Sequence, residues 1–220
     1  MFGVIASLSG CGQPPQAKSQ AAARTSSDAD RPTVLFLGTS LTAGLGLTPE
    51  QAYPALIQRK IDSAALNYTV VNAGVSGETS AGARNRTDWL LQRPVAVLVV
   101  ETGANDGLRG LPADSLRANI EAILERARRL RPTPKLVLLG MRIPPNYGRA
   151  YSEQFRSVYS ELAREYGATL VPFLLEGVGG VAALNQPDGV HPTAEGQKKM
   201  GETVWKVLEP VLRGTVSSAQ

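Results

Sequence analysis

The sequence predicts an α/β domain, a three-layer α/β/α sandwich in which helices cover both faces of a five-stranded parallel sheet. Five apolar runs of strand length recur after residue 32, and longer segments with a helical spacing of apolar residues separate them. Because the runs are apolar throughout, they are typical of strands that are buried on both faces. The alternation of strands and helices indicates right-handed crossovers between parallel neighbours.

The five apolar runs are rich in valine and leucine. They occupy residues 33–38, 68–73, 96–102, 135–141 and 169–174. In sheets of this kind, sites form at the carboxyl ends of the strands. The functional residues are therefore expected directly after each run.

The segment 116–130 carries one apolar stripe with arginine and glutamate opposite, which predicts an amphipathic helix. The stripe consists of Leu116, Ile120, Ile123, Leu124 and Ala127. A second such stripe lies between the fourth and fifth runs, at Phe155, Val158, Tyr159, Leu162 and Tyr166. Further helices are predicted near residues 51–62, 80–93 and 192–212.

The composition narrows the possible function classes. The chain has 220 residues, enough for one domain with a sizeable core. Its 23 basic and 19 acidic residues give a net charge of only +4, and 5% of residues are aromatic, so nucleic-acid binding is disfavoured. A single cysteine and a single histidine exclude an intrachain disulfide and an ordinary structural zinc site. No motif implies a metal or an organic cofactor.

The amino-terminal residues are not predicted to join the fold. Residues 1–10 are apolar and small, and Leu8-Ser9-Gly10-Cys11 resembles the lipobox of bacterial lipoproteins, where the cysteine is lipidated. The resemblance implies an exported protein, periplasmic or tethered to the membrane through Cys11. No lysine or arginine precedes this stretch, although export signals normally carry one, so an uncleaved tail with an irrelevant thiol is the alternative.

Composition also divides the chain. Residues 1–11 form the signal-peptide or lipobox-like segment, and residues 12–31, rich in Gln, Ala and Ser, predict a flexible linker. The folded domain is expected over residues 32–214, with a short tail at 215–220.

Three familiar signatures are missing from the loops after the runs. There is no Gly-x-x-x-x-Gly-Lys-Ser/Thr phosphate loop, and Gly44-Leu-Gly46 lacks the third glycine of a dinucleotide fingerprint. No Gly-x-Ser-x-Gly elbow occurs, which argues against the ordinary α/β-hydrolase arrangement.

The loops instead carry polar residues suited to acyl transfer. Ser40 follows the first run, Gly77 lies in the loop after the second, and Asn105 follows the third. A serine can act as a nucleophile, and a glycine amide or an asparagine side chain can face a developing oxyanion. Each residue also has a simpler interpretation, because Ser40 or Thr39 can cap a helix and the other two suit ordinary turns.

The only histidine lies in Asp188-Gly189-Val190-His191-Pro192. Pro192 opens the last predicted helix, so His191 lies at a helix entrance. The spacing allows the Asp188 carboxylate to reach the imidazole, fix its tautomer and stabilise the imidazolium. An exposed loop histidine beside a capping aspartate is the alternative. A neutral-pH serine hydrolase that needs a histidine base would have to use His191.

Together these blocks resemble those of the GDSL/SGNH hydrolases, whose name records Ser, Gly, Asn and His. The matching blocks are Gly38-Thr39-Ser40-Leu41, Gly77, Gly103-x-Asn105-Asp106 and Asp188-x-x-His191. Within that superfamily, the chain is similar from about residue 33 to 212 to the bacterial periplasmic arylesterases and multifunctional thioesterase/protease/lysophospholipase enzymes. The resemblance implies the flavodoxin-like SGNH hydrolase fold.

The resemblance also implies a role for each residue. Ser40 is the expected nucleophile, His191 the general base and then acid, and Asp188 the group that orients His191. The expected oxyanion hole consists of the amides of Ser40 and Gly77 with the side chain of Asn105. The family's usual aspartate before the nucleophile is Thr39 here, which puts the stiffness of the nucleophile loop in doubt.

The implied function is a serine esterase of the arylesterase, acyl-thioesterase or lysophospholipase type, which hydrolyses short- to medium-chain acyl esters through an acyl-enzyme intermediate. Its partner is then a small-molecule acyl ester or thioester, and no partner protein is implied. A carbohydrate O-deacetylase with the same site is the alternative enzyme. A non-catalytic binding module is a third interpretation that the fold alone would permit.

A substrate-binding surface is predicted beside Asn105. Leu108 and Leu111 lie in a loop with two glycines and offer apolar surface to an acyl chain. Ile143, Pro145 and Tyr147, after the fourth run, are expected to form a second apolar wall. The alternative is an ordinary surface turn whose leucines pack on the neighbouring helix.

Overall fold

The computed structural model of the protein describes residues 31–215. The predicted lipobox-like segment with Cys11, nearly all of the predicted linker and most of the predicted tail lie outside the described residues. These three remain predictions.

Five parallel strands form one sheet in the order β2-β1-β3-β4-β5, as predicted for an α/β sandwich. The third, fourth and fifth strands end earlier than their apolar runs. The fifth is the shortest, because Pro172 has no backbone N–H to extend its ladder. The strands are β1 (Thr33–Gly38), β2 (Thr69–Gly74), β3 (Val97–Glu101), β4 (Lys135–Leu139) and β5 (Thr169–Val171).

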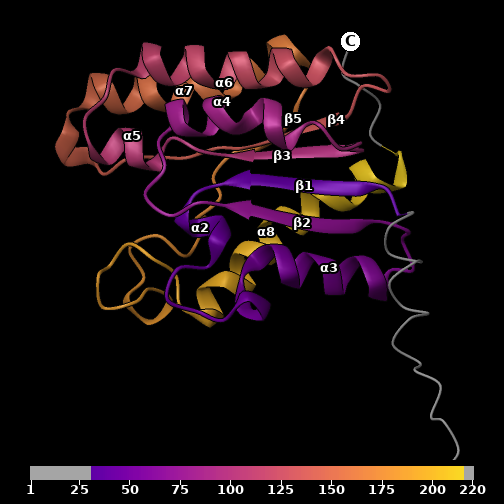
Figure 1. The fold of residues 1–220 in the computed structure, drawn as a ribbon. Helices are drawn as coiled ribbons and strands as arrows, with labels where there is room; N and C mark the ends of the chain where they lie inside the picture. The colour runs from indigo at the N-terminus through magenta and orange to yellow at the C-terminus, as the bar shows by residue number, and fades with distance from the viewer. Residues whose placement is uncertain (1–30, 216–220) are drawn as a thin grey trace, which may run out of the picture. The chain divides into compact units, whose positions relative to one another are not determined.

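Helices cover both faces of the sheet (Figure 1). One layer consists of α4 (Ser80–Leu90), α6 (Ala113–Arg128) and α7 (Arg149–Tyr166), and the other of α3 (Tyr53–Ser63) and α8 (Ala194–Arg213). All five helices were expected near these positions. No helix within residues 31–215 is long and apolar enough to cross a membrane.

The short elements lie in the connections. They are α2 (Ser40–Ala43), α5 (Ala104–Leu108) and the 3₁₀ helices η1 (Pro49–Gln51), η2 (Pro145–Tyr147) and η3 (Ala182–Leu184). Both α2 and α5 begin within three residues of the end of a strand. The residues that open these helices therefore lie at the carboxyl edge of the sheet.

The core fills the space between the layers. The predicted apolar stripe of α6 is completely buried, with every member 0% exposed. On the other face, Phe36 of β1 meets Tyr53 of α3 edge to face, with ring centroids 5.6 Å apart. Strand β1 is thus held against α3 by aromatic packing.

Strand β2 and helix α8 fix the position of α2. At Gly74 a Cβ would lie 2.3 Å from the backbone nitrogen of Ala43, so only glycine allows α2 to approach β2 this closely. Asn72 of β2 donates to the Thr42 carbonyl at 2.8 Å. From α8, the buried Gln197 side chain donates to the Leu41 carbonyl at 3.1 Å. The turn that carries Ser40 is therefore anchored to two elements distant in sequence.

Candidate active site

Ser40, His191 and Asp188 form one hydrogen-bonded row. The Ser40 hydroxyl lies 2.9 Å from His191 Nε2, and His191 Nδ1 lies 2.6 Å from Asp188 Oδ2. Ser40 comes from the first turn of α2, whereas the other two come from the loop before α8. A hydroxyl, an imidazole and a carboxylate in this order can transfer a proton from the hydroxyl to the ring.

The loop around Asp188 holds its carboxylate in place. Asp188 Oδ1 accepts hydrogen bonds from the backbone N–H groups of Val190 and His191 at 2.9 and 3.0 Å. Hydrogen bonds from the His191 side chain and from these two backbone groups lower the pKa of Asp188 to about 2. The carboxylate is therefore ionised at neutral pH, and its other oxygen is aimed at the ring.

Gln186 joins the loop of the histidine to the loop after α2. Its side chain donates to the Leu45 carbonyl at 2.7 Å and to the Pro192 carbonyl at 3.0 Å. Its backbone N–H donates to the His191 carbonyl at 2.7 Å. These bonds fix the imidazole against the segment that carries the serine.

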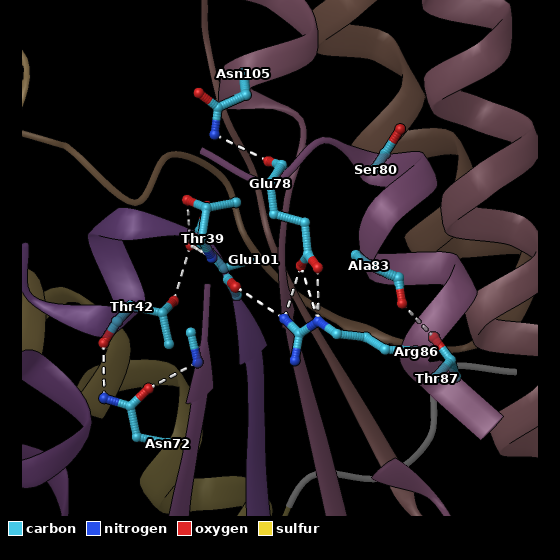
Figure 2. A network of polar contacts seen from close by, with 12 residues as sticks. Thr39, Thr42, Asn72, Glu78, Ser80, Ala83, Arg86, Thr87, Glu101 and Asn105 are labelled. Carbon is cyan, nitrogen blue, oxygen red and sulfur yellow. Dashed lines mark hydrogen bonds and ion pairs between the residues drawn. The ribbon is translucent and has the colours of Figure 1, made fainter. Parts of the chain in front are cut away.

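Thr39 does not cap α2 with its side chain, although it occupies the N-cap position. Its hydroxyl instead donates to the Glu101 carboxyl at 3.0 Å, and its backbone N–H donates to Glu101 Oε2 at 2.7 Å. The Thr42 hydroxyl donates to the same oxygen at 2.8 Å (Figure 2). The capping interpretation of the Thr39 side chain is therefore wrong, and the loop that carries Ser40 is held by a carboxyl group on the neighbouring strand.

Glu101 is the site-supporting residue that the sequence interpretation missed. It ends β3 and is 1% exposed. Burial raises the pKa of Glu101, while the hydrogen bonds from Thr39 and Thr42 act in the opposite direction. The sequence signal that could have revealed this role is a single acid at the end of an otherwise apolar run, because a buried acid needs polar partners.

Gly77 and Asn105 meet at the ends of β2 and β3. The Asn105 side chain donates to the carbonyl of Glu78, the residue after Gly77, at 2.9 Å. Gly77 has a φ of +77°, a conformation that favours glycine, and a Cβ there would meet nothing within 4 Å. The Ser40 N–H lies in the first turn of α2, where helical N–H groups have no partner within the helix. Three N–H groups from three adjacent strand ends are thus available to an anion.

A second buried network fixes α5, which carries Asn105. Asp106 is 1% exposed and accepts hydrogen bonds from both the backbone N–H and the hydroxyl of Ser80. Asn119 of α6 donates to the same hydroxyl at 2.9 Å. The start of α5 is therefore tied to the start of α4.

The residues predicted to bind substrate differ in their exposure. Leu108 and Leu111 are 42% and 37% exposed. Ile143 is only 8% exposed and packs in the core against Gly107. The Tyr147 hydroxyl donates to the Leu108 carbonyl at 2.9 Å, and nothing is described for the Pro145 side chain. The two leucines therefore offer the apolar surface, and Tyr147 connects their loop to the segment after β4.

Among residues 31–215, no group of three His, Cys, Asp or Glu side chains is arranged to hold a metal ion.

A model of the GDSL-like lipase/acylhydrolase family matches residues 36–199. The chain belongs to this family.

The relatives of this GDSL-family chain include several esterases. Esterase TesA of Pseudomonas aeruginosa is 42% identical over 206 residues, which cover 93% of this chain and 98% of the relative. Thioesterase 1/protease 1/lysophospholipase L1 of Escherichia coli is 36% identical over 181 residues, covering 82% and 85%. A crystal structure of TesA matches with a TM-score of 0.77 at 43% identity, covering 81% of this chain and 99% of that one. The chain is thus a hydrolase of ester bonds with the SGNH esterase fold.

The bond between Thr39 and Glu101 predicts a stability difference between two buried threonines. Thr39→Val removes a hydroxyl that donates to a carboxyl group, so we expect it to lower the free energy of unfolding by about 1–3 kcal/mol. Thr87→Val is the matched control, because the Thr87 hydroxyl is equally buried but donates at 2.8 Å to the neutral Ala83 carbonyl within α4. Urea denaturation should give the control a loss below about 1 kcal/mol. Equal losses would contradict the anchoring role of Glu101.

Proposed function

We propose that this esterase uses Ser40 as a nucleophile in an acyl-enzyme cycle, with His191 as its base and Asp188 as the group that orients the base. The observation that carries the proposal is the row from Ser40 Oγ to His191 Nε2 at 2.9 Å and from His191 Nδ1 to Asp188 at 2.6 Å. As Ser40 Oγ attacks the ester carbonyl, its proton moves to His191 Nε2. The Asp188 carboxylate stabilises the resulting imidazolium.

Negative charge on the tetrahedral intermediate needs hydrogen-bond donors. The backbone N–H groups of Ser40 and Gly77 and the side chain of Asn105 are the proposed donors. One N–H of the Asn105 amide is held by the Glu78 carbonyl, so the amide is oriented before substrate binds. Donors fixed in this way need little reorganisation when the oxyanion forms.

His191 acts next as an acid, to complete acylation, and then as a base in deacylation. The protonated His191 gives its proton to the leaving alcohol or thiol, whose bond to the carbonyl carbon breaks, and the acyl group stays on Ser40 Oγ. In the second half, His191 takes a proton from a water that attacks the acyl carbon. The second tetrahedral intermediate then collapses: the bond from the acyl carbon to Ser40 Oγ breaks, His191 returns the proton to that oxygen, and the carboxylic acid leaves. One histidine is sufficient for both halves.

The surface around the site favours apolar acyl groups. Six exposed large hydrophobic side chains among residues 31–215 belong to the connections between the strands and the long helices, whereas Val71 lies within β2 and Trp89 within α4. Apolar side chains on these connections suit acyl esters and thioesters as substrates. The six are Leu45, Val75, Leu108 at the end of α5, Leu111, Val181 and Val190.

Removal of either Ser40 or His191 should abolish most of the turnover. For Ser40→Ala and His191→Ala we expect kcat on p-nitrophenyl acetate to fall by about a thousandfold or more, with the thermal unfolding midpoint nearly unchanged. The double variant should be little worse than either single one, because the residues act as a unit. A fluorophosphonate probe should label the wild type and leave Ser40→Ala unlabelled. Near-normal hydrolysis by a verified Ser40→Ala protein, or no labelling of the wild type, would refute the mechanism.

The low pKa of Asp188 predicts that its charge is present throughout mild acid and neutral pH. Asp188 stays ionised above about pH 3, so no loss of kcat/KM in mild acid should come from protonation of this carboxylate. Asp188→Asn should lower kcat by about a hundredfold to ten-thousandfold. Initial rates of both proteins at neutral pH, where the wild-type carboxylate is ionised, test this, and a wild-type kcat in the variant would remove Asp188 from the mechanism.

The exposed leucines predict how activity depends on acyl length. Along a p-nitrophenyl ester series from acetate to palmitate, kcat/KM should rise by up to about fourfold per methylene, the equivalent of ~0.8 kcal/mol, until the apolar surface is covered. Leu108→Ala should flatten this rise. Val71→Ala is the matched control, because Val71 is also 42% exposed but lies within β2.

One outcome of the ester series would favour the alternative enzyme activity. A sharp optimum at acetate, together with release of acetate from acetylated glycans, would replace the broad esterase with a carbohydrate O-deacetylase.

A further inference from the structure

We propose that Arg86 is a positioning residue that sets the geometry of the oxyanion hole by joining Glu78 to the Gly38 carbonyl. The inference rests on the proposed function, because it concerns the N–H donors of Ser40, Gly77 and Asn105. It adds a group on α4, whose described contacts are with protein atoms that flank these donors.

Glu78 holds the Arg86 guanidinium in a two-pronged ion pair. Arg86 Nε lies 2.8 Å from Glu78 Oε1, and Arg86 Nη2 lies 2.7 Å from Glu78 Oε2 (Figure 2). The two side chains are only 19% and 10% exposed. Forked pairs shielded from solvent hold their geometry better than single contacts between exposed side chains. The absence of a side chain at Gly82 makes room for Glu78, because a Cβ there would lie 2.6 Å from Glu78 Cγ.

The same guanidinium holds the nucleophile loop. Arg86 Nη2 donates to the Gly38 carbonyl at 3.1 Å, and the backbone N–H of Val75 donates to that carbonyl at 2.9 Å. Gly38 lies two residues before Ser40, and Val75 lies two residues before Gly77. The loops that carry two of the three proposed donors are therefore joined at one carbonyl group, and Arg86 is the charged donor at that point.

The third proposed donor depends on the same residue pair. Asn105 donates to the backbone carbonyl of Glu78 at 2.9 Å, while the Glu78 carboxylate binds Arg86. Loss of the guanidinium would release the Glu78 side chain and remove one partner of the Gly38 carbonyl. All three donors would then lose part of the restraint on their relative positions.

Displacement of the oxyanion donors should affect kcat more than KM. These donors stabilise charge that develops only in the transition state, and a displacement of about 1 Å can cost about a hundredfold in rate. Since Arg86 acts through Gly38 and Glu78 and not on the ground-state substrate, its loss should lower kcat and leave KM nearly unchanged.

Arg126 provides a matched control. Its Nε lies 3.2 Å from the Asp88 carboxylate, and its Nη1 donates to the Arg84 carbonyl at 2.6 Å. Like Arg86, it combines an ion pair with a bond to a backbone carbonyl, which here belongs to α4, and its side chain is 31% exposed. These contacts join α6 to α4 without involving Gly38, Glu78 or Asn105.

The test compares Arg86→Ala, Arg86→Lys and Arg126→Ala in kcat, KM and thermal unfolding midpoint on p-nitrophenyl esters. For Arg86→Ala we expect kcat to fall about tenfold to a hundredfold, with KM within about twofold of wild type. Arg126→Ala should keep both constants within about twofold. Arg86→Lys keeps the charge but not the fork, so it should recover only part of kcat.

Chemical rescue separates positioning from a general loss of stability. Millimolar guanidinium chloride, compared with equal sodium chloride, should raise kcat of Arg86→Ala by filling the space between Glu78 and Gly38. It should not raise kcat of Arg126→Ala or of Asn105→Ala, because neither leaves that space empty.

Several results would overturn the inference. A wild-type kcat in Arg86→Ala would overturn it, and so would an effect of this variant on KM alone. It would also be overturned if guanidinium failed to raise the lowered kcat of Arg86→Ala, or raised kcat of Arg126→Ala by the same factor. If Arg86→Ala does not fold, an unchanged kcat in Arg86→Lys overturns it and a selective loss of kcat supports it. Failure of the proposed function is seen separately, as wild-type hydrolysis that persists in Ser40→Ala.

Discussion

The pairing of β1 with both β2 and β3 is the constraint on which the site depends. Gly38 lies opposite Gly74, and Leu37 lies opposite both Ala73 and Val100, so the three strands end at nearly the same level. The segments that leave them are therefore close enough to exchange hydrogen bonds. A shift of β1 by one residue would turn its buried side chains to the opposite face. The apolar core thus determines the level at which Ser40 emerges.

Buried polar groups at that edge convert proximity into a defined arrangement. Glu101 binds the loop that follows β1, and Asp106 binds the start of α4. A buried carboxyl is costly unless it is hydrogen-bonded, and each of these finds its partners on the element whose position it controls. Such contacts add little net stability compared with apolar packing, so their main effect here is to favour one arrangement of the loops.

Local patterns in the sequence predicted the elements of the fold, because burial on one face leaves a periodic pattern and burial on both faces leaves a continuous apolar run. The positions of Ser40 and Asn105 after predicted strands, and the resemblance of the sequence to the SGNH blocks, also predicted that these loops lie at one edge of the sheet. The supports of the site left no such record. Glu101 and Thr39 are 62 positions apart, and a hydrogen bond between such distant residues leaves no repeating pattern in the sequence. Likewise, Ile143 was expected on the surface, but its burial depends on the absence of a side chain at Gly107, far away in sequence.

The hydrogen bond between Ser40 and His191 joins residues 151 positions apart, and the bond from Gln197 to Leu41 spans 156. Chains are made from the amino terminus, and domains generally fold as units. A growing chain that already holds all five strands therefore still lacks its histidine and the helix that anchors the serine turn. Until the last few dozen residues have been added and docked, the Ser40 hydroxyl lacks its hydrogen-bond partner on His191. With Ser40 and His191 in their proposed roles, a chain at that stage would not hydrolyse esters, and the onset of hydrolysis would mark the completion of the fold.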